Sequence, residues 1–271
     1  MNTAIEFRHV RKSYGDNVVI PDLNLKIFKG EFITIIGTSG CGKTTVLKLV
    51  NGLYEATSGD IFINEENIKD KDLIMLRRYI GYAIQGSILF PNMTVEQNIS
   101  YVPRLLNRKN KAKTLQAVDK WMKLVGLDDS MRERYPSELS GGQQQRVGIA
   151  RALAASPDIL LMDEPFGAVD AITRDQLQTE LKNIHSRTGI TILFVTHDIE
   201  EALKLGTKVM VMDHGEILQF ATPDEILRNP ANSFVHRLVE KRRRMCNIPE
   251  EQLGECKFSG VSCGATDRQP V

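Results

Sequence analysis

Short apolar runs separated by polar and glycine-rich positions fill the first part of the chain. Over residues 4–36 these runs alternate with polar positions or last only a few residues, which predicts β-strands. Phe32–Ile36 is a short, mostly apolar run that leads directly into Gly37, and Thr44–Val50 has the character of a helix. The pattern therefore predicts a strand, a glycine-rich loop and a helix in succession.

Residues 94–156 follow a different pattern, with apolar positions spaced by three and four. This spacing predicts α-helices, because it places the apolar side chains on one face. One helix is expected over Ala112–Val125 and another over Gln143–Ala155, which ends before Pro157 because proline cannot continue a helix. The apolar face expected for the first helix comprises Leu115, Val118, Trp121, Met122, Leu124 and Val125.

Continuous apolar runs return at Ile159–Met162, Ile190–Val195 and Val209–Met212, with helical patterns between them. Such runs are typical of parallel strands that are covered on both faces. His214-Gly215 separates the last run from Ile217–Phe220 and predicts a hairpin turn. We expect an α/β fold with a mainly parallel sheet, an antiparallel N-terminal part and a helical subdomain inserted at about residues 94–156.

The composition is that of an ordinary globular protein, since 42% of the 271 residues are hydrophobic and 25% are charged. The formal net charge of +1 gives no electrostatic reason to expect nucleic acid as a partner. No apolar run approaches the roughly 20 residues that span a bilayer, and residues 1–6 lack the pattern of a signal peptide. We therefore expect a cytoplasmic protein, in a compartment rich in ATP and Mg²⁺.

The C-terminal segment differs from the rest of the chain. Residues 246–271 are rich in glycine, serine, proline and polar residues, which predicts a flexible tail. Its cysteines match neither a disulfide framework nor a zinc site, so free thiols are expected at Cys246, Cys256 and Cys263. The basic run Lys241–Arg244 before the tail either contacts anionic lipid headgroups or forms a solvated helix end.

The segment that begins at Gly37 fits the pattern of a phosphate-binding loop. Its glycines let the backbone curl so that successive N–H groups point at the phosphates of a nucleotide. Lys43 adds a positive charge for the same oxygens, and the hydroxyl of Thr44 is suited to bind Mg²⁺. The alternative is a glycine-rich turn with an incidental lysine, but the flanking strand and helix favour the phosphate site. The candidate ATP-binding residues in this loop are Gly37, Thr38, Ser39, Gly40, Cys41, Gly42, Lys43, Thr44 and Thr45.

Two carboxylates follow the apolar run at Ile159–Met162. Asp163, at the end of a strand beside the phosphate loop, is placed to accept a hydrogen bond from a water bound to Mg²⁺, and is a candidate metal residue. Glu164 is placed to polarise an attacking water as a general base. The alternative is an ordinary turn, since Asp-Glu-Pro also has good turn chemistry.

A second anion-binding cap is expected at residues 140–143, directly before a predicted helix. The free N–H groups of Ser140, Gly141, Gly142 and Gln143, at the positive end of the helix dipole, favour a phosphate. One subunit cannot easily use two such caps on one ATP, whereas two copies packed head to tail can share it. The alternative is plain N-capping of the helix by Ser140.

Three further residues are candidates for nucleotide binding. The imidazole of His197, which follows a predicted strand, can hydrogen-bond a γ-phosphate and orient the water that Glu164 activates. The amide oxygen of Gln85 can ligate Mg²⁺ or water, and Tyr14 can stack on adenine. The other histidines are interpreted as structural.

With these motifs in order, the chain resembles the ATP-binding subunit of an ABC transporter over about residues 3–240. The resemblance implies an ABC ATPase domain of the P-loop NTPase type over residues 1–245, and a homodimer that closes on two ATP molecules with Mg²⁺. It implies catalysis by Lys43, Glu164 and His197. The motifs that support it are Tyr14, the loop 37–44, Gln85, the signature 139–143, the segment 159–164, Asp170 and His197.

The same resemblance implies the partners and the location of the chain. Gln85 would link the nucleotide to transmembrane permease subunits, and Asp170 would reach across the dimer. A substrate-binding protein or domain would take part indirectly. The chain would then lie at the cytoplasmic face of the cell membrane, attached through the permease.

Longer segments are similar to bacterial importers of quaternary amines, namely glycine betaine, carnitine and choline. Thr38 stands where such relatives usually have proline and Val169 where they have leucine, which we expect to adjust loop rigidity and interface packing only. Many of them carry paired CBS domains that residues 246–271 cannot form, so osmotic gating through this chain is not expected. The segments that carry the similarity are Asn98–Leu106, Arg134–Leu139, Asp163–Leu177 and Thr222–Pro230.

Two alternatives to a quaternary-amine importer are open. They differ from it in the transported substrate or in the class of ABC protein. The first is an importer of another small solute, such as an amino acid, a polyamine or a betaine-like thiol compound. The second is a soluble ABC ATPase that acts on ribosomes or DNA. Proteins of that class carry two cassettes or a long coiled coil, whereas this sequence has one cassette, so the transporter is favoured.

Overall fold

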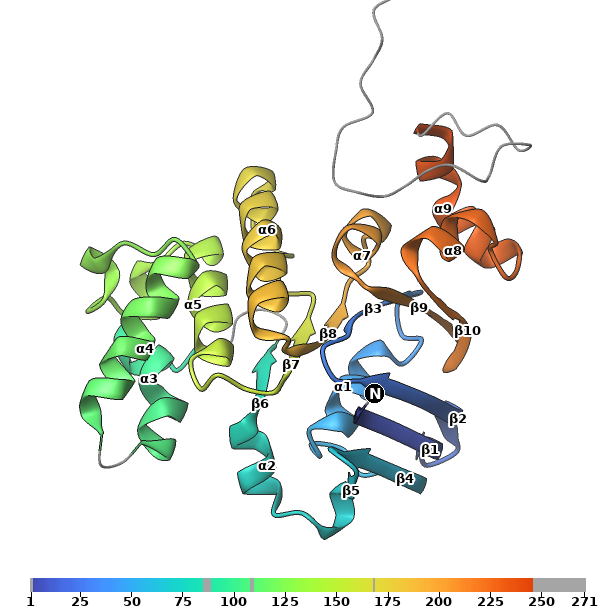
Figure 1. Cartoon of the computed structure of the whole chain (residues 1–271), viewed down its shortest axis with the longest axis horizontal. Helices are drawn as coiled ribbons and strands as arrows, with labels where there is room; N and C mark the ends of the chain where they lie inside the picture. Colours follow the sequence, from blue (N-terminus) through green and yellow to red (C-terminus); the bar gives the residue numbers. More distant parts are fainter. Residues whose placement is uncertain (1, 85–88, 108–109, 168, 246–271) are drawn as a thin grey trace, which may run out of the picture.

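The computed structural model describes residues 2–84, 89–107, 110–167 and 169–245, with residues 241–245 described for the backbone alone. The candidate Gln85, the tail 246–271 and the side chains of the basic run 241–244 lie outside what is described. The described strands form two sheets, with helices on the faces of the larger one (Figure 1). Within these residues, no helix is both long and apolar enough to cross a bilayer.

The smaller sheet is antiparallel and contains the N-terminal strands that the sequence predicts. Its strand order is β2-β1-β4-β5, and every pair of neighbours in it is antiparallel. The strands are β1 (Thr3–Tyr14), β2 (Asn17–Phe28), β4 (Ser58–Ile63) and β5 (Glu66–Asn67), followed by the short 3₁₀ helix η1 (Ile68–Asp70).

The larger sheet has the order β10-β9-β3-β8-β7-β6 and is parallel except for its last hairpin. That hairpin joins β9 to β10 through His214 (φ 46°) and Gly215 (φ 80°), which confirms the predicted turn. The strands are β3 (Phe32–Gly37), β6 (Ile80–Ala83), β7 (Ile159–Asp163), β8 (Thr191–Val195), β9 (Lys208–Asp213) and β10 (Glu216–Ala221).

Helix α1 (Lys43–Val50) lies between the two sheets (Figure 1). Its apolar side chains belong to one buried cluster with residues of β1, β2 and β4 on one side and of β3, β7 and β8 on the other. Because burial of apolar side chains is the main favourable contribution to folding, this cluster fixes the start of α1 against the end of β3. The short helix α2 (Leu73–Tyr79) leads from the smaller sheet to β6.

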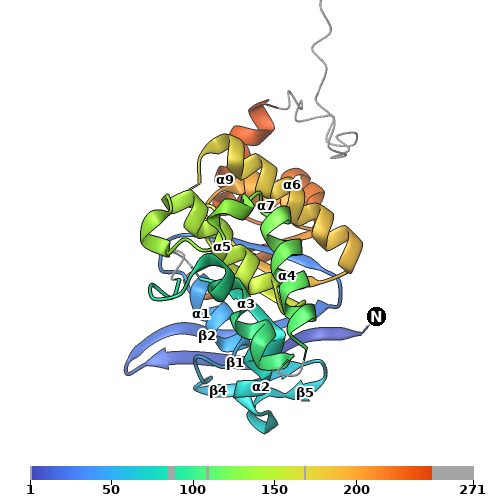
Figure 2. The same cartoon turned by 90° about the vertical axis from the view of Figure 1, so that its left-hand side faces the viewer.

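The opposite face of the larger sheet is covered by helices, three of which form the layer seen at the front in Figure 2. These three are α3 (Val95–Leu106), α4 (Lys111–Leu124) and α5 (Gly141–Leu153), which confirm the helices predicted for this part of the chain. The 3₁₀ turns η2 (Asp129–Met131) and η3 (Pro136–Glu138) connect α4 to α5. The remaining helices are α6 (Ala171–Thr188), α7 (Ile199–Leu205), α8 (Pro223–Arg228) and α9 (Ser233–Met245).

The predicted apolar face of α4 is wrong at one position. Leu115 is 44% exposed, whereas Thr114 beside it is buried together with Val118, Trp121 and Met122. Successive residues of a helix are rotated by about 100°, so Thr114 lies near the centre of the buried face and Leu115 lies at its edge, beyond Met122. A threonine can occupy a buried helix position because its hydroxyl contacts the helix backbone, here the carbonyl oxygen of Asn110 at 3.5 Å.

Candidate active site

Three neighbouring parallel strands end at one edge of the larger sheet and bring distant residues together. Ile35 of β3 pairs with Val195 of β8, and Val195 pairs with Asp163 of β7. Because the carboxyl ends of parallel strands coincide, the loop after β3, the Asp163-Glu164 pair and His197 lie at the same edge. The sheet thus gathers the candidate phosphate-binding and catalytic residues of one copy.

The glycines of the loop are required by its conformation. A Cβ atom at Gly37 would lie 2.0 Å from the carbonyl oxygen of Met212, so no side chain fits at this position. Gly42 has a φ of 105° and forms the N-cap of α1. Residues with a Cβ atom rarely adopt that φ, so the curl of the loop into the helix depends on glycine.

The loop is fastened to the β9–β10 hairpin. The hydroxyl of Thr38 donates to Asp213 Oδ1 at 2.7 Å, and the N–H of Gly215 donates to the carbonyl oxygen of Cys41 at 3.1 Å. Thr38 stands where proline was expected from the family pattern, and a proline has no hydroxyl to make this bond. Asp213 is therefore a loop-positioning residue that the sequence did not indicate.

Lys43 is buried inside the curl of the loop. Its ammonium donates to the carbonyl oxygens of Gly37 at 3.0 Å and Thr38 at 2.7 Å. The third N–H of the ammonium points to Cys41 Sγ at 3.9 Å, a long and weak contact that a phosphate oxygen could replace while the two carbonyl bonds fix the side chain. The positive charge is thereby held at the point where the loop N–H groups converge.

Thr44 and Asp163 form the pair that is suited to Mg²⁺. The hydroxyl of Thr44 donates to Asp163 Oδ1 at 3.1 Å, although the two residues are far apart in sequence. Asp163 is only 3% exposed. Burial raises the pKa of its carboxyl above the ordinary value, and the bond from Thr44 offsets part of this effect. A divalent cation favours two such oxygens, so this donor set fits Mg²⁺.

Among the described residues, no group of three or more histidine, cysteine, aspartate or glutamate side chains is arranged to hold a metal ion. The third expected metal residue, Gln85, lies outside the described residues.

Glu164 and His197 face each other beside this pair. His197 Nδ1 lies 3.4 Å from Glu164 Oε2, with the imidazole largely exposed and the carboxylate half-buried. Glu164 has a φ of 45°, a left-handed conformation that is strained for a residue with a side chain. Its N–H donates to the carbonyl oxygen of Val195 at 3.0 Å, so the end of β8 holds the strained residue in place.

A small hollow of about 50 Å³ opens beside Glu164 and His197. Its other walls include Arg174, Thr196 and Glu201. A space of this size is enough for a water molecule, which needs only about 15 Å³ and two or more polar partners. The hollow therefore offers a place for water next to the candidate base.

Tyr14 lies at the end of β1 next to α1. Its ring meets that of Tyr54 edge to face, with centroids 5.8 Å apart, and the ammonium of Lys12 lies 4.7 Å from the ring centroid. Tyr54 follows α1 and receives a hydrogen bond from Lys48 of that helix at 3.4 Å. Tyr14 is 45% exposed, so an aromatic surface is available beside the phosphate loop.

Residues 140–143 lie in the helical layer and not at the phosphate loop. Ser140 caps α5, since its hydroxyl accepts the N–H of Gln143 at 3.3 Å and the Gln143 side chain accepts the N–H of Ser140 at 2.9 Å. The N-capping by Ser140 that the sequence offered as the alternative is therefore present. The N–H groups of Gly141 and Gly142 donate to no described residue, and Gly141 is exposed at the surface. One copy of the chain thus presents this end of α5 outward.

Asp170 is also exposed and caps α6. Its carboxylate accepts the N–H of Thr173 at 3.0 Å, and this bond lowers the pKa of the carboxyl. Like Ser140 in α5, Asp170 forms its hydrogen bonds with the first turn of its own helix, to Thr173 and Arg174. The two groups expected to act between copies are thus both at the surface.

The sequence matches the family model described as ABC transporter over residues 20–167, which is more than half of the chain. The chain belongs to the ABC transporter family. It is 54% identical over 240 residues to the carnitine transport ATP-binding protein OpuCA of Listeria monocytogenes, covering 88% of this chain and 60% of that protein. It is 51% identical to the glycine betaine/carnitine/choline transport ATP-binding protein OpuCA of Bacillus subtilis, covering 91% of this chain and 65% of the relative.

A solved ABC structure has the same fold. The ATP-binding cassette MJ0796, in a dimeric post-hydrolysis state bound to ADP and Pi, is 32% identical with a TM-score of 0.76, over 81% of this chain and 98% of that one. The expected ABC ATPase fold is therefore confirmed. The chain spans only about three fifths of the length of the curated OpuCA relatives.

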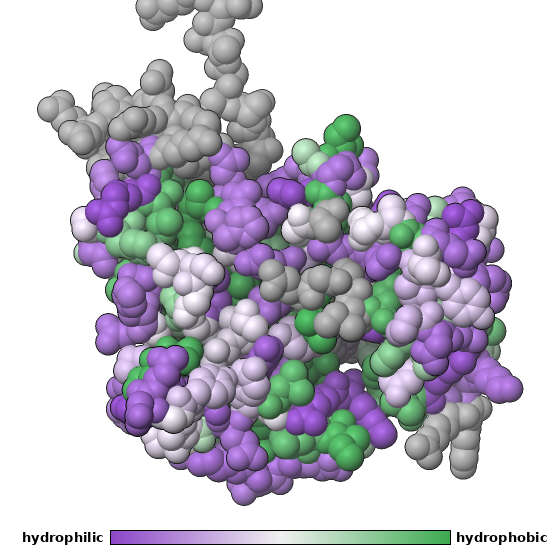
Figure 3. Space-filling model, turned by 180° about the vertical axis from the view of Figure 1, so that it is seen from behind, coloured by the Kyte–Doolittle hydropathy of each residue, from purple (hydrophilic) through white to green (hydrophobic). Residues whose placement is uncertain are grey.

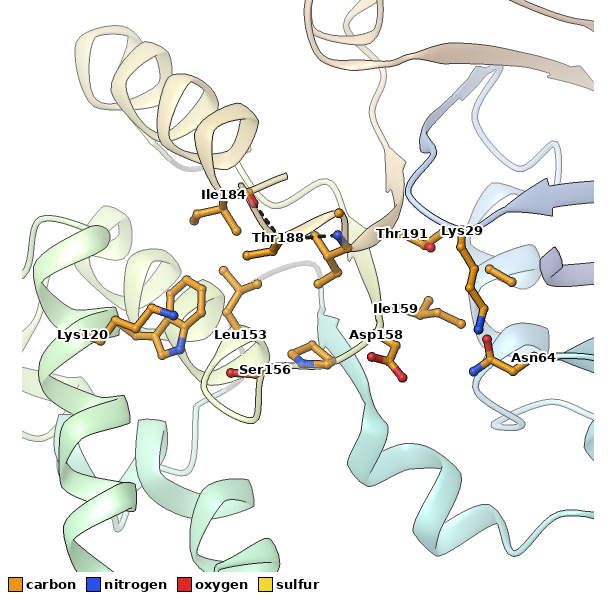
Figure 4. A pocket seen from close by; sticks show the side chains of 15 residues that line it. Lys29, Asn64, Lys120, Leu153, Ser156, Asp158, Ile159, Ile184, Thr188 and Thr191 are labelled. Carbon is orange, nitrogen blue, oxygen red and sulfur yellow. Dashed lines mark hydrogen bonds between the residues drawn. The ribbon is translucent and has the colours of Figure 1, made fainter. Parts of the chain in front are cut away.

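A different pocket of this ABC chain, of about 350 Å³, lies at the opposite edge of the larger sheet (Figure 4). Asp158 and Ile159, at the beginning of β7, and Thr191, at the beginning of β8, contribute to its wall. It contains none of the candidate ATP-binding or catalytic residues. This pocket is therefore separate from the candidate residues, which lie at the carboxyl ends of the strands.

Proposed function

We propose that the chain is the ATP-hydrolysing subunit of a bacterial ABC importer, and that two copies close on two ATP molecules to drive uptake of a quaternary amine osmolyte. The observation that supports hydrolysis most strongly is the convergence of Lys43, Thr44, Asp163, Glu164 and His197 at one edge of the sheet. This set combines a phosphate cradle, a metal site and a base with an orienting imidazole.

In the proposed reaction, the loop N–H groups and Lys43 hold the β- and γ-phosphates. Thr44, Asp163 and Gln85 would hold Mg²⁺, which would neutralise negative charge on these phosphates. Glu164 accepts a proton from a water in the adjacent hollow, the water oxygen forms a bond to the γ-phosphorus, and the bond from that phosphorus to the bridging oxygen breaks and releases ADP. His197, with Nδ1 near Glu164, directs its other ring nitrogen at the γ-phosphate. Tyr14 contacts the adenine.

The second copy completes each site. The exposed end of α5 at Ser140-Gly141-Gly142 covers the γ-phosphate that the other copy holds, and Asp170 reaches across the same interface. The dimeric state of the solved ABC relative supports this arrangement. Binding of ATP then closes the pair of copies, and hydrolysis reopens it.

Permease subunits are the proposed membrane partner. Phe90 and Tyr101, the latter in α3, are each 37% exposed, and their tilted rings have centroids 4.9 Å apart; helix α2 also exposes Ile74 and Met75. Figure 3 shows hydrophobic residues exposed at the lower edge of the molecule, the edge at which Figure 1 places α2. A partner that covers these residues would bury apolar surface. The chain would then work at the cytoplasmic face of the membrane.

The substrate class is tested by uptake of radiolabelled glycine betaine, carnitine and choline into cells that lack the gene. We expect uptake of at least one of them to be lost, restored by the wild-type gene and not restored by Glu164→Gln. Asp175→Asn, a carboxylate-to-amide change at an exposed position of α6, should restore it fully. Unchanged uptake of all three would point to another small solute, such as an amino acid or a polyamine, and overturn the proposed substrate.

A further inference from the structure

Glu201 of α7 is a buried carboxylate in the wall of the hollow beside the candidate base. It is 8% exposed and belongs to no family motif that the sequence indicated. Its Oε2 accepts the hydroxyl of Thr196 at 2.6 Å, and its Oε1 accepts the side-chain amide of Gln178 at 3.1 Å. Burial of a carboxylate is costly, and an apolar residue of similar size is often at least as stable, so packing alone does not account for this residue.

The hydrogen bonds of Glu201 form a network, and its Thr196 end fixes the position of the backbone on both sides of His197. The hydroxyl of Thr196 donates to Glu201 and also accepts the N–H of Asp198 at 3.0 Å. Both neighbours of His197 are therefore tied to the same buried carboxylate. His197 itself is largely exposed, so surrounding side chains do not enclose its imidazole. The network instead holds the imidazole near Glu164 through the backbone on either side of His197.

The other end of the network reaches the segment that carries Asp170. Arg174 Nε lies 3.9 Å from Glu201 Oε1, and the Arg174 guanidinium donates to the carbonyl oxygen of Val169 at 3.1 Å. The Arg174 Nε–H is buried and has no hydrogen-bond acceptor among the described residues. A shift of less than 1 Å in either partner would turn the long ion pair into a charge-assisted hydrogen bond.

We infer that Glu201 is a positioning residue that couples His197 to the Asp170 segment of the same copy, through Thr196 on one side and Arg174 on the other. When the second copy contacts Asp170, Val169 and Arg174 move with it, and the Arg174–Glu201 contact tightens. Thr196 then brings His197 into line with Glu164. The inference rests on the proposed function, because it requires an ATP site that a second copy completes.

The test compares ATP hydrolysis by purified Glu201→Gln and wild-type chains with their thermal unfolding. The variant keeps the size and an acceptor for Thr196 but loses the charge that faces Arg174. The Gln178 amide, which now donates to Glu201, can rotate and accept from the new amide instead. We expect kcat to fall about tenfold or more, while KM for ATP and the unfolding temperature change little. The matched control is Lys204→Met, which breaks an exposed ion pair with Asp175 between the same two helices and should keep kcat within twofold.

Further variants keep the test decisive if Glu201→Gln folds poorly. Thr196→Val removes only the hydroxyl link and should lower kcat as Glu201→Gln does, whereas Thr196→Ser keeps the hydroxyl and should retain activity. In a double-mutant cycle, Arg174→Gln and Glu201→Gln together should reduce kcat no more than either alone.

Two outcomes would overturn this inference while leaving the proposed function intact. They are a Glu201→Gln chain as active as wild type, and additive losses of kcat in the double-mutant cycle. An inactive wild-type chain would overturn the proposed function, and this inference with it.

Discussion

The substitution Asp163→Asn should stabilise the nucleotide-free chain while abolishing its Mg²⁺-dependent function. The carboxylate is 3% exposed and lies next to Glu164, and its recorded donor is the hydroxyl of Thr44. The amide keeps an oxygen to accept that bond and removes the buried charge. Because an incompletely paired buried charge costs several kcal/mol and a hydrogen bond to a charged group returns about 1.5–3 kcal/mol, we expect a gain of roughly 1–2 kcal/mol.

The assay is thermal unfolding with and without ATP and Mg²⁺. For a chain of this size, the expected gain corresponds to an increase in the unfolding temperature of roughly 3–6 °C without ligand. Wild type should gain about 2.7 kcal/mol at a nucleotide concentration 100 times Kd, and the variant should lose the part that depends on Mg²⁺. The matched control is Asp213→Asn, at the same edge and also bonded to a threonine but less buried, which should change the unfolding temperature little.

The pH dependence of unfolding gives an independent check of the sign of the stability change expected for Asp163→Asn. A carboxyl whose pKa is raised in the folded chain favours the protonated form, so its ionisation destabilises the fold, completely above the raised pKa and not at all well below the ordinary value. The stability advantage of Asp163→Asn should therefore be greatest above the raised pKa and should shrink as the pH falls through it towards the ordinary value. A lower unfolding temperature for the variant at pH 7, or an advantage that grows in acid, would refute the reasoning.

Two pairs of substitutions test the packing. Gly37→Ala should destabilise the chain by about 1–3 kcal/mol and abolish ATP binding, because its Cβ would lie 2.0 Å from the Met212 carbonyl oxygen. The control Gly141→Ala meets no atom within 4 Å and needs no left-handed backbone, so it should change the stability by less than about 0.5 kcal/mol. Equal losses measured by denaturant unfolding would contradict this. In α4, Leu115→Ala should change the stability by less than about 0.5 kcal/mol and Val118→Ala should cost about 2 kcal/mol, and the reverse order would contradict the observed helix face.

The parts of the fold that follow a local pattern were predictable from the sequence. The strand before Gly37, the helix after it and the hairpin at His214-Gly215 each depend on neighbouring residues, and the structure confirms them. The helix over α4 was also predicted, but Leu115 was placed on its buried face. A run of apolar residues at a spacing of three and four fits two adjacent faces of a helix, and only the tertiary packing decides between them.

The contacts that position the site were not predictable from the sequence. The bond between Thr38 and Asp213 requires β3 to lie beside β9, and the contact between Arg174 and Glu201 requires α6 to pack beside α7. No local pattern specifies this strand order or this packing, so Asp213 and Glu201 were missed. The motif residues themselves were found because each phosphate or metal contact needs a particular side chain or glycine at a fixed spacing.

The central claim is that residues 140–143 of one copy complete the ATP site of the other. The most direct measurement is the mass in solution, by analytical ultracentrifugation, of Glu164→Gln with ATP and Mg²⁺, compared with Glu164→Gln carrying Gly141→Glu. Gly141 is exposed and a Cβ atom there meets nothing within 4 Å, so the second change should leave the single copy folded and able to bind ATP. We expect the first protein to dimerise with ATP and the second to remain monomeric with ATP bound. An ATP-bound monomer of the first, or an equally stable dimer of the second, would contradict the account.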